Sequence, residues 1–133
     1  VWSMIGGTMA VPAVYAARAG WETIARLGVH RIRKKSLRQT TLLRGLLEAR
    51  GFRINTPLAD EARGGTLCVD FEGAEAVSRE LSRRRYFHDY RPRCGIRVSP
   101  HFYTTDEELH RFVDALAERR LRPAQGHPIA PPG

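Results

Sequence analysis

The hydrophobic pattern of the chain changes its period at Gly51, and this change limits the folds open to it. Before Gly51, apolar residues recur at the three- and four-residue spacing of amphipathic helices. After Gly51, they occur in short runs separated by turn-forming residues, a pattern typical of strands. The chain is therefore predicted to begin with helices and to continue as a mixed structure that contains a sheet.

Two helices are expected before the change of period. The first has Pro12 in its first turn, where the missing N–H costs nothing, and ends near Leu27, just before Gly28. The second runs from about Val29 to Arg50, and Gly51 supplies its C-terminal stop. Its apolar residues are expected on one face of the helix: Val29, Ile32, Leu43, Leu46 and Leu47.

Strands and helices alternate in the second part of the chain. Short apolar runs predict strands at 52–55, 66–71, 86–92 and 95–100. Between the second and third run, a stripe at helical spacing predicts a helix that contains Ala74, Val77 and Leu81. Thr105 and Glu108 form a capping-box pattern, which predicts the start of a last helix. Its buried face is expected to hold Leu109, Phe112, Val113 and Leu116.

The order of elements, α-α-β-β-α-β-β-α, predicts an α/β (α+β) fold in which helices cover one face of a short, mostly antiparallel sheet. Residues 1–50 are expected to link to a large domain that is missing, and 51–120 to form a small C-terminal domain. The Pro- and Gly-rich residues 121–133 are expected to be a disordered tail. A start in mid-pattern at Val1 indicates a fragment of a larger protein.

Charge and cysteine content limit the classes of function that are expected for this chain. The formal net charge is +8, with 22 Lys and Arg against 14 Asp and Glu, but the basic residues are spread mainly along predicted helices. Solvated helix faces are therefore favoured over a nucleic-acid site. Cys68 and Cys94 lack the spacing of a zinc site or a disulfide framework, and no histidine pair has metal-ligand spacing. Without a visible signal peptide or membrane span, a reduced cytoplasmic protein is expected.

Arg97 is the one charged residue inside the apolar run "GIRVSP". Because side chains alternate along a strand, Ile96 and Val98 are expected to face the core and Arg97 the opposite side. A guanidinium there offers a planar fork suited to a bidentate grip on a carboxylate. The pattern alone also fits an ordinary exposed arginine on an edge strand.

Two long segments carry a resemblance to a known family. The string "GIRVSPHFYTTDEELHRFVDAL" is similar to the C-terminal strand and helix of the class V aminotransferase family, the fold-type-I enzymes that use pyridoxal phosphate. Upstream, "GGTMAVPAVYAARAGWETIARLGVHRIRKKSLRQTTLLRGLLEARGFRINTP" resembles the kynureninase-like members of that family. The resemblance covers the chain from Gly6 to about Glu118 in the right order.

This resemblance implies part of a homodimeric enzyme that acts on an amino acid, with hydrolytic Cβ–Cγ cleavage of kynurenine as the favoured reaction. It places Arg97 at the position that binds the substrate carboxylate, and Gly7 and Thr8 in the loop that reaches the cofactor phosphate. The family also needs a lysine that binds pyridoxal phosphate covalently. Lys34 and Lys35 lie in mid-helix, so the catalytic lysine is expected to be absent, and this chain alone to be inactive.

Two alternatives stay open. The chain could come from another class V enzyme, a cysteine desulfurase or an aminotransferase. It could instead be a small basic α/β module that binds RNA or a protein partner, in which case nucleic-acid binding should fall steeply with salt.

Overall fold

The computed structural model describes residues 10–121. They fall into two compact units that divide between Lys34 and Lys35. In the first unit, α1 (Val11–Leu27) has Pro12 in its first turn and ends at Gly28, whose N–H donates to the Ile24 carbonyl at 2.9 Å. Helix α2 (Val29–Ala49) follows and continues into the second unit. Both helices were predicted from the sequence, and their bounds are confirmed to within one residue at most ends.

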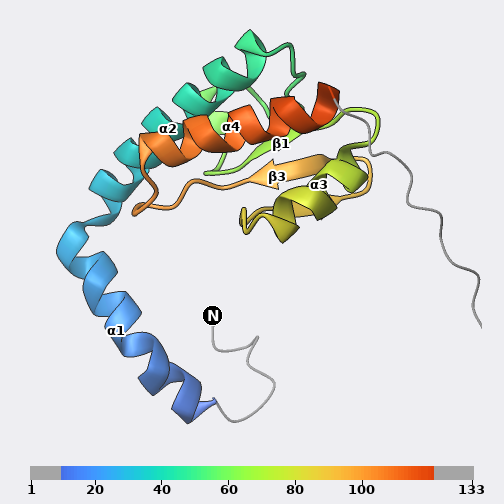
Figure 1. The fold of residues 1–133 in the computed structure, drawn as a ribbon. Helices are drawn as coiled ribbons and strands as arrows, with labels where there is room; N and C mark the ends of the chain where they lie inside the picture. The colour runs from blue at the N-terminus through green and yellow to red at the C-terminus, as the bar shows by residue number, and fades with distance from the viewer. Residues whose placement is uncertain (1–9, 122–133) are drawn as a thin grey trace, which may run out of the picture. The chain divides into compact units, whose positions relative to one another are not determined.

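The second unit is built on a three-stranded antiparallel sheet in the order β1-β3-β2 (Figure 1). The strands are β1 (Leu67–Val69), β2 (Asp89–Arg91) and β3 (Gly95–Val98). Two helices complete it, α3 (Ala74–Arg83) between β1 and β2, and α4 (Asp106–Leu121) after β3. A short 3-10 helix, Asp60–Ala62, lies in the connection from α2 to β1. The predicted class, a small mixed domain with an antiparallel sheet, is confirmed.

One hydrophobic core joins the sheet to the helices. The buried sheet residues are Leu67, Val69, Ile96 and Val98, which alternate along β1 and β3 and therefore lie on one face. The helices contribute Leu43, Leu47, Leu81, Leu109, Phe112, Val113 and Leu116 to the same cluster. The predicted buried face of α4 is confirmed. On α2 the prediction was partly wrong, because Val29 is 66% exposed and, among the residues predicted for the buried face, only Leu43 and Leu47 are fully buried.

The strand predicted at 52–55 does not form. Only a single bridge, Ile54 to Val69, links this segment to the sheet. The Asn55 N–H donates to the Cys68 carbonyl at 2.9 Å, but the Cys68 N–H donates to the Thr56 hydroxyl at 2.8 Å rather than to a backbone carbonyl. The Thr56 hydroxyl thus replaces the backbone carbonyl that would accept the next hydrogen bond of a strand pair, and Pro57 has no N–H to donate. The pairing therefore stops after one bridge.

Helices α2 and α4 lie side by side and run in the same direction (Figure 1). At the start of α4, the Arg38 guanidinium donates to both carboxylate oxygens of Asp106, at 2.6 and 2.9 Å. Gln39 Nε2 donates to the Thr104 carbonyl at 2.8 Å. The predicted capping box is present, with the Thr105 N–H donating to Glu108 Oε2 at 2.7 Å. These contacts fix the loop that leads from β3 into α4.

The Arg38–Asp106 pair should make stability depend on pH in the acid range. The hydrogen bonds from Arg38, and then from Gln39, lower the pKa of Asp106 from 3.8 to about 2. A carboxyl with a lowered pKa in the folded state stabilises the fold above its ordinary pKa, and this contribution is lost as pH falls toward the lowered value. Arg38→Leu should therefore lower the free energy of unfolding near neutral pH, and the difference from wild type should shrink as pH falls from 3.8 to about 2.

Urea denaturation of both proteins across this range measures the effect. Arg79→Leu is the matched control, since Arg79 pairs with Glu75 within α3 and both side chains are more than half exposed. A difference between Arg38→Leu and wild type that is constant from neutral pH to about 2 would contradict the role given to this pair.

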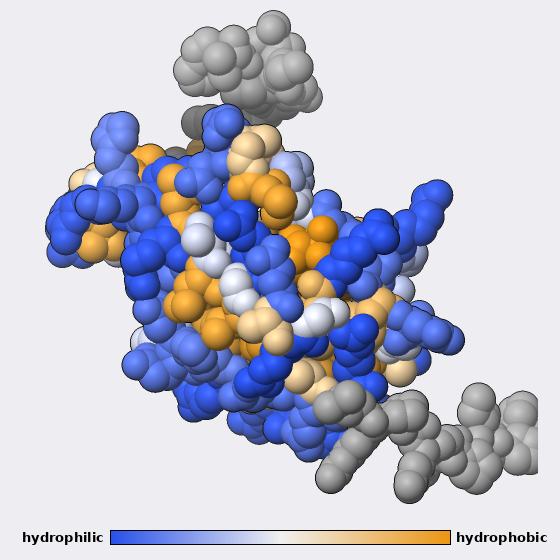
Figure 2. All heavy atoms as spheres, turned by 90° about the horizontal axis from the view of Figure 1, so that it is seen from above, coloured by the Kyte–Doolittle hydropathy of each residue, from blue (hydrophilic) through white to orange (hydrophobic). Residues whose placement is uncertain are grey.

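The surface of the described residues is rich in charged groups that pair with one another. Figure 2 shows a face on which hydrophilic residues dominate and hydrophobic residues form small groups between them. Arginines in the helices and at their ends contact carboxylates, among them Arg50 with Asp114, Arg79 with Glu75, and Arg84 with Glu118. No helix of residues 10–121 is both long enough and apolar enough to cross a membrane.

Candidate functional site

Arg97 lies in the middle of β3, the central strand of the sheet. Its Cα is opposite Cys68 of β1 on one side and opposite Asp89 of β2 on the other. Ile96 and Val98, its neighbours in sequence, are buried in the core, whereas the Arg97 side chain is 39% exposed. The predicted orientation of Arg97 away from the core is confirmed, and its strand is central rather than an edge strand.

Asp89 is the hydrogen-bonding partner of Arg97. Arg97 Nη2 donates to Asp89 Oδ2, and Arg91 Nε donates to the same oxygen at 3.0 Å. The hydrogen bond from Arg97 is the largest cause of a lowered pKa for Asp89, and the positive charges of Arg91 and Arg97 act in the same direction. Asp89 is therefore ionised near neutral pH, and its fixed carboxylate orients the guanidinium.

The guanidinium of Arg97 keeps hydrogen-bonding capacity after this contact. A guanidinium has more N–H donors than the one that Nη2 gives to Asp89, and the Arg97 side chain is 39% exposed. Two guanidinium groups, Arg91 and Arg97, face one carboxylate, Asp89, so the group carries one net positive charge. A planar donor with one uncompensated positive charge suits a single carboxylate ligand.

The rest of this sheet face is polar. The hydroxyls of Thr66 and Ser99 are 2.8 Å apart. Beside Arg97, the sulfurs of Cys68 and Cys94 are 3.1 Å apart, and both cysteines are free thiols. Strand alternation places Cys68, Arg97 and Ser99 on the face opposite Leu67, Val69, Ile96 and Val98. We call this polar surface the Arg97 face.

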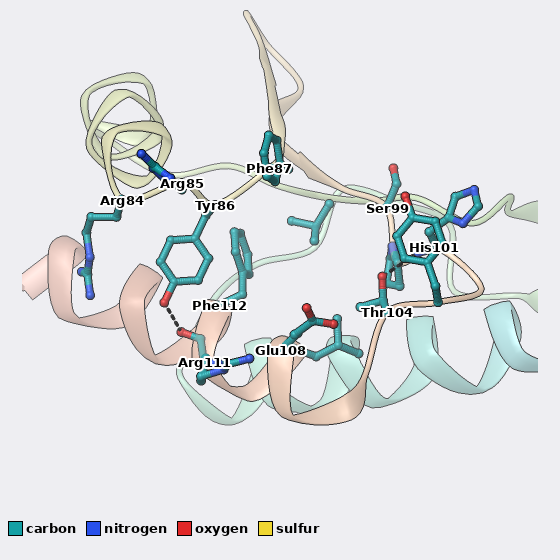
Figure 3. Close-up of a pocket in the computed structure, with 14 residues that line it drawn as sticks. Arg84, Arg85, Tyr86, Phe87, Ser99, His101, Thr104, Glu108, Arg111 and Phe112 are labelled. Atoms are coloured by element: carbon teal, nitrogen blue, oxygen red, sulfur yellow. Dashed lines mark hydrogen bonds between the residues drawn. The ribbon is translucent and has the colours of Figure 1, made fainter.

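A separate pocket of about 510 Å³ lies at the start of α4 and is not lined by Arg97. The residues that follow α3 and β3 form its walls together with α4 (Figure 3). Within it, the Tyr86 hydroxyl donates to the Arg111 carbonyl at 3.4 Å. Glu108 is engaged in the capping box, and the hydrogen bond from the Thr105 N–H lowers its pKa. Tyr86 and Glu108 thus serve local structure.

Lys35 is committed to a structural role. Its Nζ donates to the carbonyls of Phe102 at 2.7 Å and of Thr104 at 2.9 Å. The amine therefore holds the loop between β3 and α4.

The predicted cofactor residues Gly7 and Thr8 lie outside the described residues. Within residues 10–121, no group of three or more His, Cys, Asp or Glu side chains is arranged to hold a metal ion.

Sequence reasoning missed two contacts of the Arg97 face. Asp89 belongs to the neighbour pair His88 and Asp89, which the strand pattern predicts to point in opposite directions. The structure agrees, since His88 Nε2 contacts the Ser78 hydroxyl at 2.7 Å while Asp89 binds Arg97. The other missed contact is between Cys68 and Cys94, which are 26 residues apart in the chain.

The fold is shared with a much longer enzyme. The structure matches that of a cysteine desulfurase from Thermococcus onnurineus, with a TM-score of 0.76 and 19% sequence identity. The match covers 86% of this chain and 32% of that protein. At this low identity the likeness concerns the fold, which is that of one segment of a larger enzyme.

Sequence comparison gives the particular family. Residues 32–116 match the model of the kynureninase C-terminal domain, so the chain belongs to this family. It is 32% identical over 100 residues to a kynureninase of Bacillus mycoides and 38% identical over 105 residues to kynureninase 1 of Chaetomium globosum. These matches cover 71% and 68% of this chain but only 23% and 21% of the relatives. The resemblance to kynureninase-like class V proteins is confirmed.

Proposed function

We propose that this chain is the C-terminal part of a pyridoxal-phosphate enzyme that acts on an amino acid, and that Arg97 binds the carboxylate of the substrate. The single observation that carries the proposal is the placement of Arg97, in the centre of the sheet and within the matched family domain. It points away from the core and is oriented by Asp89, and together with Arg91 and Asp89 it forms a group with one net positive charge. The favoured reaction is hydrolytic Cβ–Cγ cleavage of kynurenine.

The described residues do not form a cofactor site by themselves. The chain has two lysines, of which Lys35 is held by two backbone carbonyls and Lys34 is its neighbour in the same helix. When bound, pyridoxal phosphate supplies the electron withdrawal that weakens bonds at Cα and Cβ of an amino acid. The lysine that binds it would belong to a large domain of the intact enzyme, with Gly7 and Thr8 reaching its phosphate, as the family resemblance implies.

The contribution of the described residues is then to bind and orient. The Arg97 guanidinium would hold the substrate carboxylate, which fixes the amino acid relative to the reacting centre. Asp89 would keep the guanidinium in one orientation, so that less rotamer freedom is lost when substrate binds. The Arg97 face would accordingly be turned toward the large domain. We retain the division into a linking segment 1–50, a small domain 51–120 and a tail 121–133 as a proposal, and likewise the homodimer.

An assay of the intact enzyme, loaded with pyridoxal phosphate, tests the proposed reaction. Hydrolysis of kynurenine at the Cβ–Cγ bond should release anthranilate and alanine. Sulfide release from cysteine, or amino transfer to a keto acid without anthranilate, would assign the chain to another class V activity and overturn the favoured one. The alternative of a basic module gains no support from Arg38, Arg50, Arg79 and Arg84, which pair with carboxylates in or next to the helices.

Asp89→Asn should raise the KM of the intact enzyme for its amino acid several-fold, with a smaller change in kcat. The amide keeps the size of the side chain but loses the charge that orients Arg97. Because Arg97 holds the pKa of Asp89 below its ordinary value, the effect should be the same across the neutral pH range.

Steady-state kinetics of wild type and variant measure this effect. Asp114→Asn is the matched control, since Asp114 of α4 pairs with Arg50, which follows the end of α2. Asp89→Glu should recover part of the lost affinity. A lower KM in Asp89→Asn would mean that Asp89 competes with the substrate for Arg97, and the orienting role would be rejected.

A further inference from the structure

Cys68 and Cys94 lie against each other on the Arg97 face. Cys68 is the middle residue of β1, and Cys94 lies in the turn between β2 and β3. The Cys94 thiol donates to the Cys68 sulfur across 3.1 Å. Both side chains are partly exposed, so a small reagent can reach them. The fold thus brings together two thiols that are 26 residues apart in the chain.

Gly95 explains why the turn approaches β1 so closely. A Cβ at this position would lie 2.3 Å from the Val69 carbonyl oxygen and 2.7 Å from Asp70 atoms, so only glycine allows the contact. Gly95 has a φ of 87°, and Arg93, on the other side of Cys94, has a φ of 65°. The Cys94 N–H also donates to the Arg91 carbonyl at 3.1 Å. The position of Cys94 is therefore set by the backbone.

We propose that Cys68 and Cys94 form a dithiol–disulfide site, which reacts by exchange with a low-molecular-weight disulfide such as oxidised glutathione. The site is a place of reversible modification beside Arg97. It rests on the geometry of the two thiols and does not depend on the proposed enzymatic function.

The exchange has two steps, and its atoms and electrons balance. The Cys68 thiolate attacks one sulfur of the small disulfide, which forms a mixed disulfide and expels one small thiolate. Cys94 then loses its proton to solvent and attacks the Cys68 sulfur, which expels the second small thiolate. The two cysteines are oxidised by two electrons in total, the small disulfide is reduced to two thiols, and the released protons end on these thiols.

The hydrogen bond between the sulfurs gives the two cysteines different roles. Donation to Cys68 raises the pKa of Cys94, and burial and Asp70 act in the same direction, against the opposing charge of Arg97. Cys94 therefore stays protonated, and the Cys68 sulfur is the acceptor of its hydrogen bond. Cys68 is the attacking sulfur and Cys94 the resolving one.

Disulfide formation would join β1 to the β2–β3 turn next to Arg97. In the intact enzyme, such a bond would restrict the turn that connects Asp89 and Arg97. The redox state of the two thiols would then affect the geometry of the Arg97 face. Failure of the kynurenine assay would leave the thiol exchange untouched. Absence of the disulfide would leave the role of Arg97 untouched.

The test is the equilibrium of this chain with mixtures of reduced and oxidised glutathione, under native conditions and in guanidinium chloride. Mass spectrometry after acid quenching counts the chains that have lost two hydrogens. Because the native fold holds the sulfurs together, the equilibrium constant for the intramolecular disulfide should be at least about tenfold larger in the native chain than in the denatured chain. An equal or smaller native constant, or disulfides formed only between chains, would overturn the proposal.

A variant pair tests the order of the two steps. Cys94→Ser should accumulate the glutathione mixed disulfide on Cys68, because the resolving thiol is missing. Cys68→Ser should react more slowly, because burial and the charge of Asp70 still raise the pKa of the remaining thiol, Cys94. Faster reaction of Cys68→Ser than of Cys94→Ser would reverse the assignment of the attacking sulfur.

Discussion

Arg97→Ala is expected to lower kcat/KM of the intact enzyme for its amino-acid substrate by about 30-fold to several thousandfold. This range corresponds to a loss of about 2–5 kcal/mol, the cost of removing one partner from a hydrogen-bonded charge pair that is shielded from water. The loss has two sources, since the substrate carboxylate loses its donor and Asp89 loses the guanidinium that now binds it. Steady-state kinetics at substrate concentrations above and below KM measure the effect.

A second variant separates the positive charge of Arg97 from the planar geometry of its guanidinium. Arg97→Lys should recover only part of the lost activity, because an ammonium group keeps the charge without the planar fork. Cofactor loading, followed by visible absorbance, should be nearly unchanged in both variants. Arg79→Ala is the matched control on α3, where Arg79 pairs with Glu75 at the surface. Full activity of Arg97→Lys would show that charge alone is sufficient.

Gly95→Ala is expected to destabilise the fold by about 3 kcal/mol or more. The added Cβ would meet the Val69 carbonyl oxygen at 2.3 Å, and both of the crowded groups belong to paired strands that cannot move apart freely. The φ of 87° adds strain for any residue with a Cβ. Because the turn at Cys94 would have to shift, native-state formation of the Cys68–Cys94 disulfide should fall as well. Urea denaturation measures the loss of stability.

Gly45→Ala is the matched control for Gly95→Ala. Gly45 is exposed in α2, and a Cβ there has no heavy atom within 4 Å. Since alanine favours the helix by up to about 1 kcal/mol, this variant should be as stable as wild type or more stable. Equal stabilities for the two variants would mean that β1 and the β2–β3 turn are not in close contact.

The helices could be predicted because residues at their own ends carry the signals that start and stop a helix. Pro12, Gly28 and Gly51 mark the ends of α1 and α2, and the Thr105–Glu108 box marks the start of α4. The strand predicted at 52–55 was wrong because its pairing depends on which group accepts the hydrogen bond from the Cys68 N–H of β1. The Thr56 hydroxyl accepts this hydrogen bond, which a backbone carbonyl would accept in a longer strand. Apolar content gives no warning of such a competition.

The partners of Arg97 could have been found in part. The turn between β2 and β3 is short, and its pairing of Arg91 with Gly95 places Asp89 opposite Arg97. A hairpin read from "DYRPRCGIRV" would have given this pair. The Cys68–Cys94 contact could not have been found in this way, because it depends on the pairing of β1 with β3 across 26 residues.

The most direct test of the central claim compares two ligands of the intact enzyme, the amino-acid substrate and its analogue that lacks the α-carboxylate, in wild type and in Arg97→Ala. The account predicts that the mutation weakens binding of the amino acid by about 30-fold or more and leaves binding of the analogue nearly unchanged, because only the amino acid has the group that Arg97 holds. Equal losses for both ligands would mean that Arg97 supports the sheet or a domain contact, and would contradict its assignment as the carboxylate-binding residue.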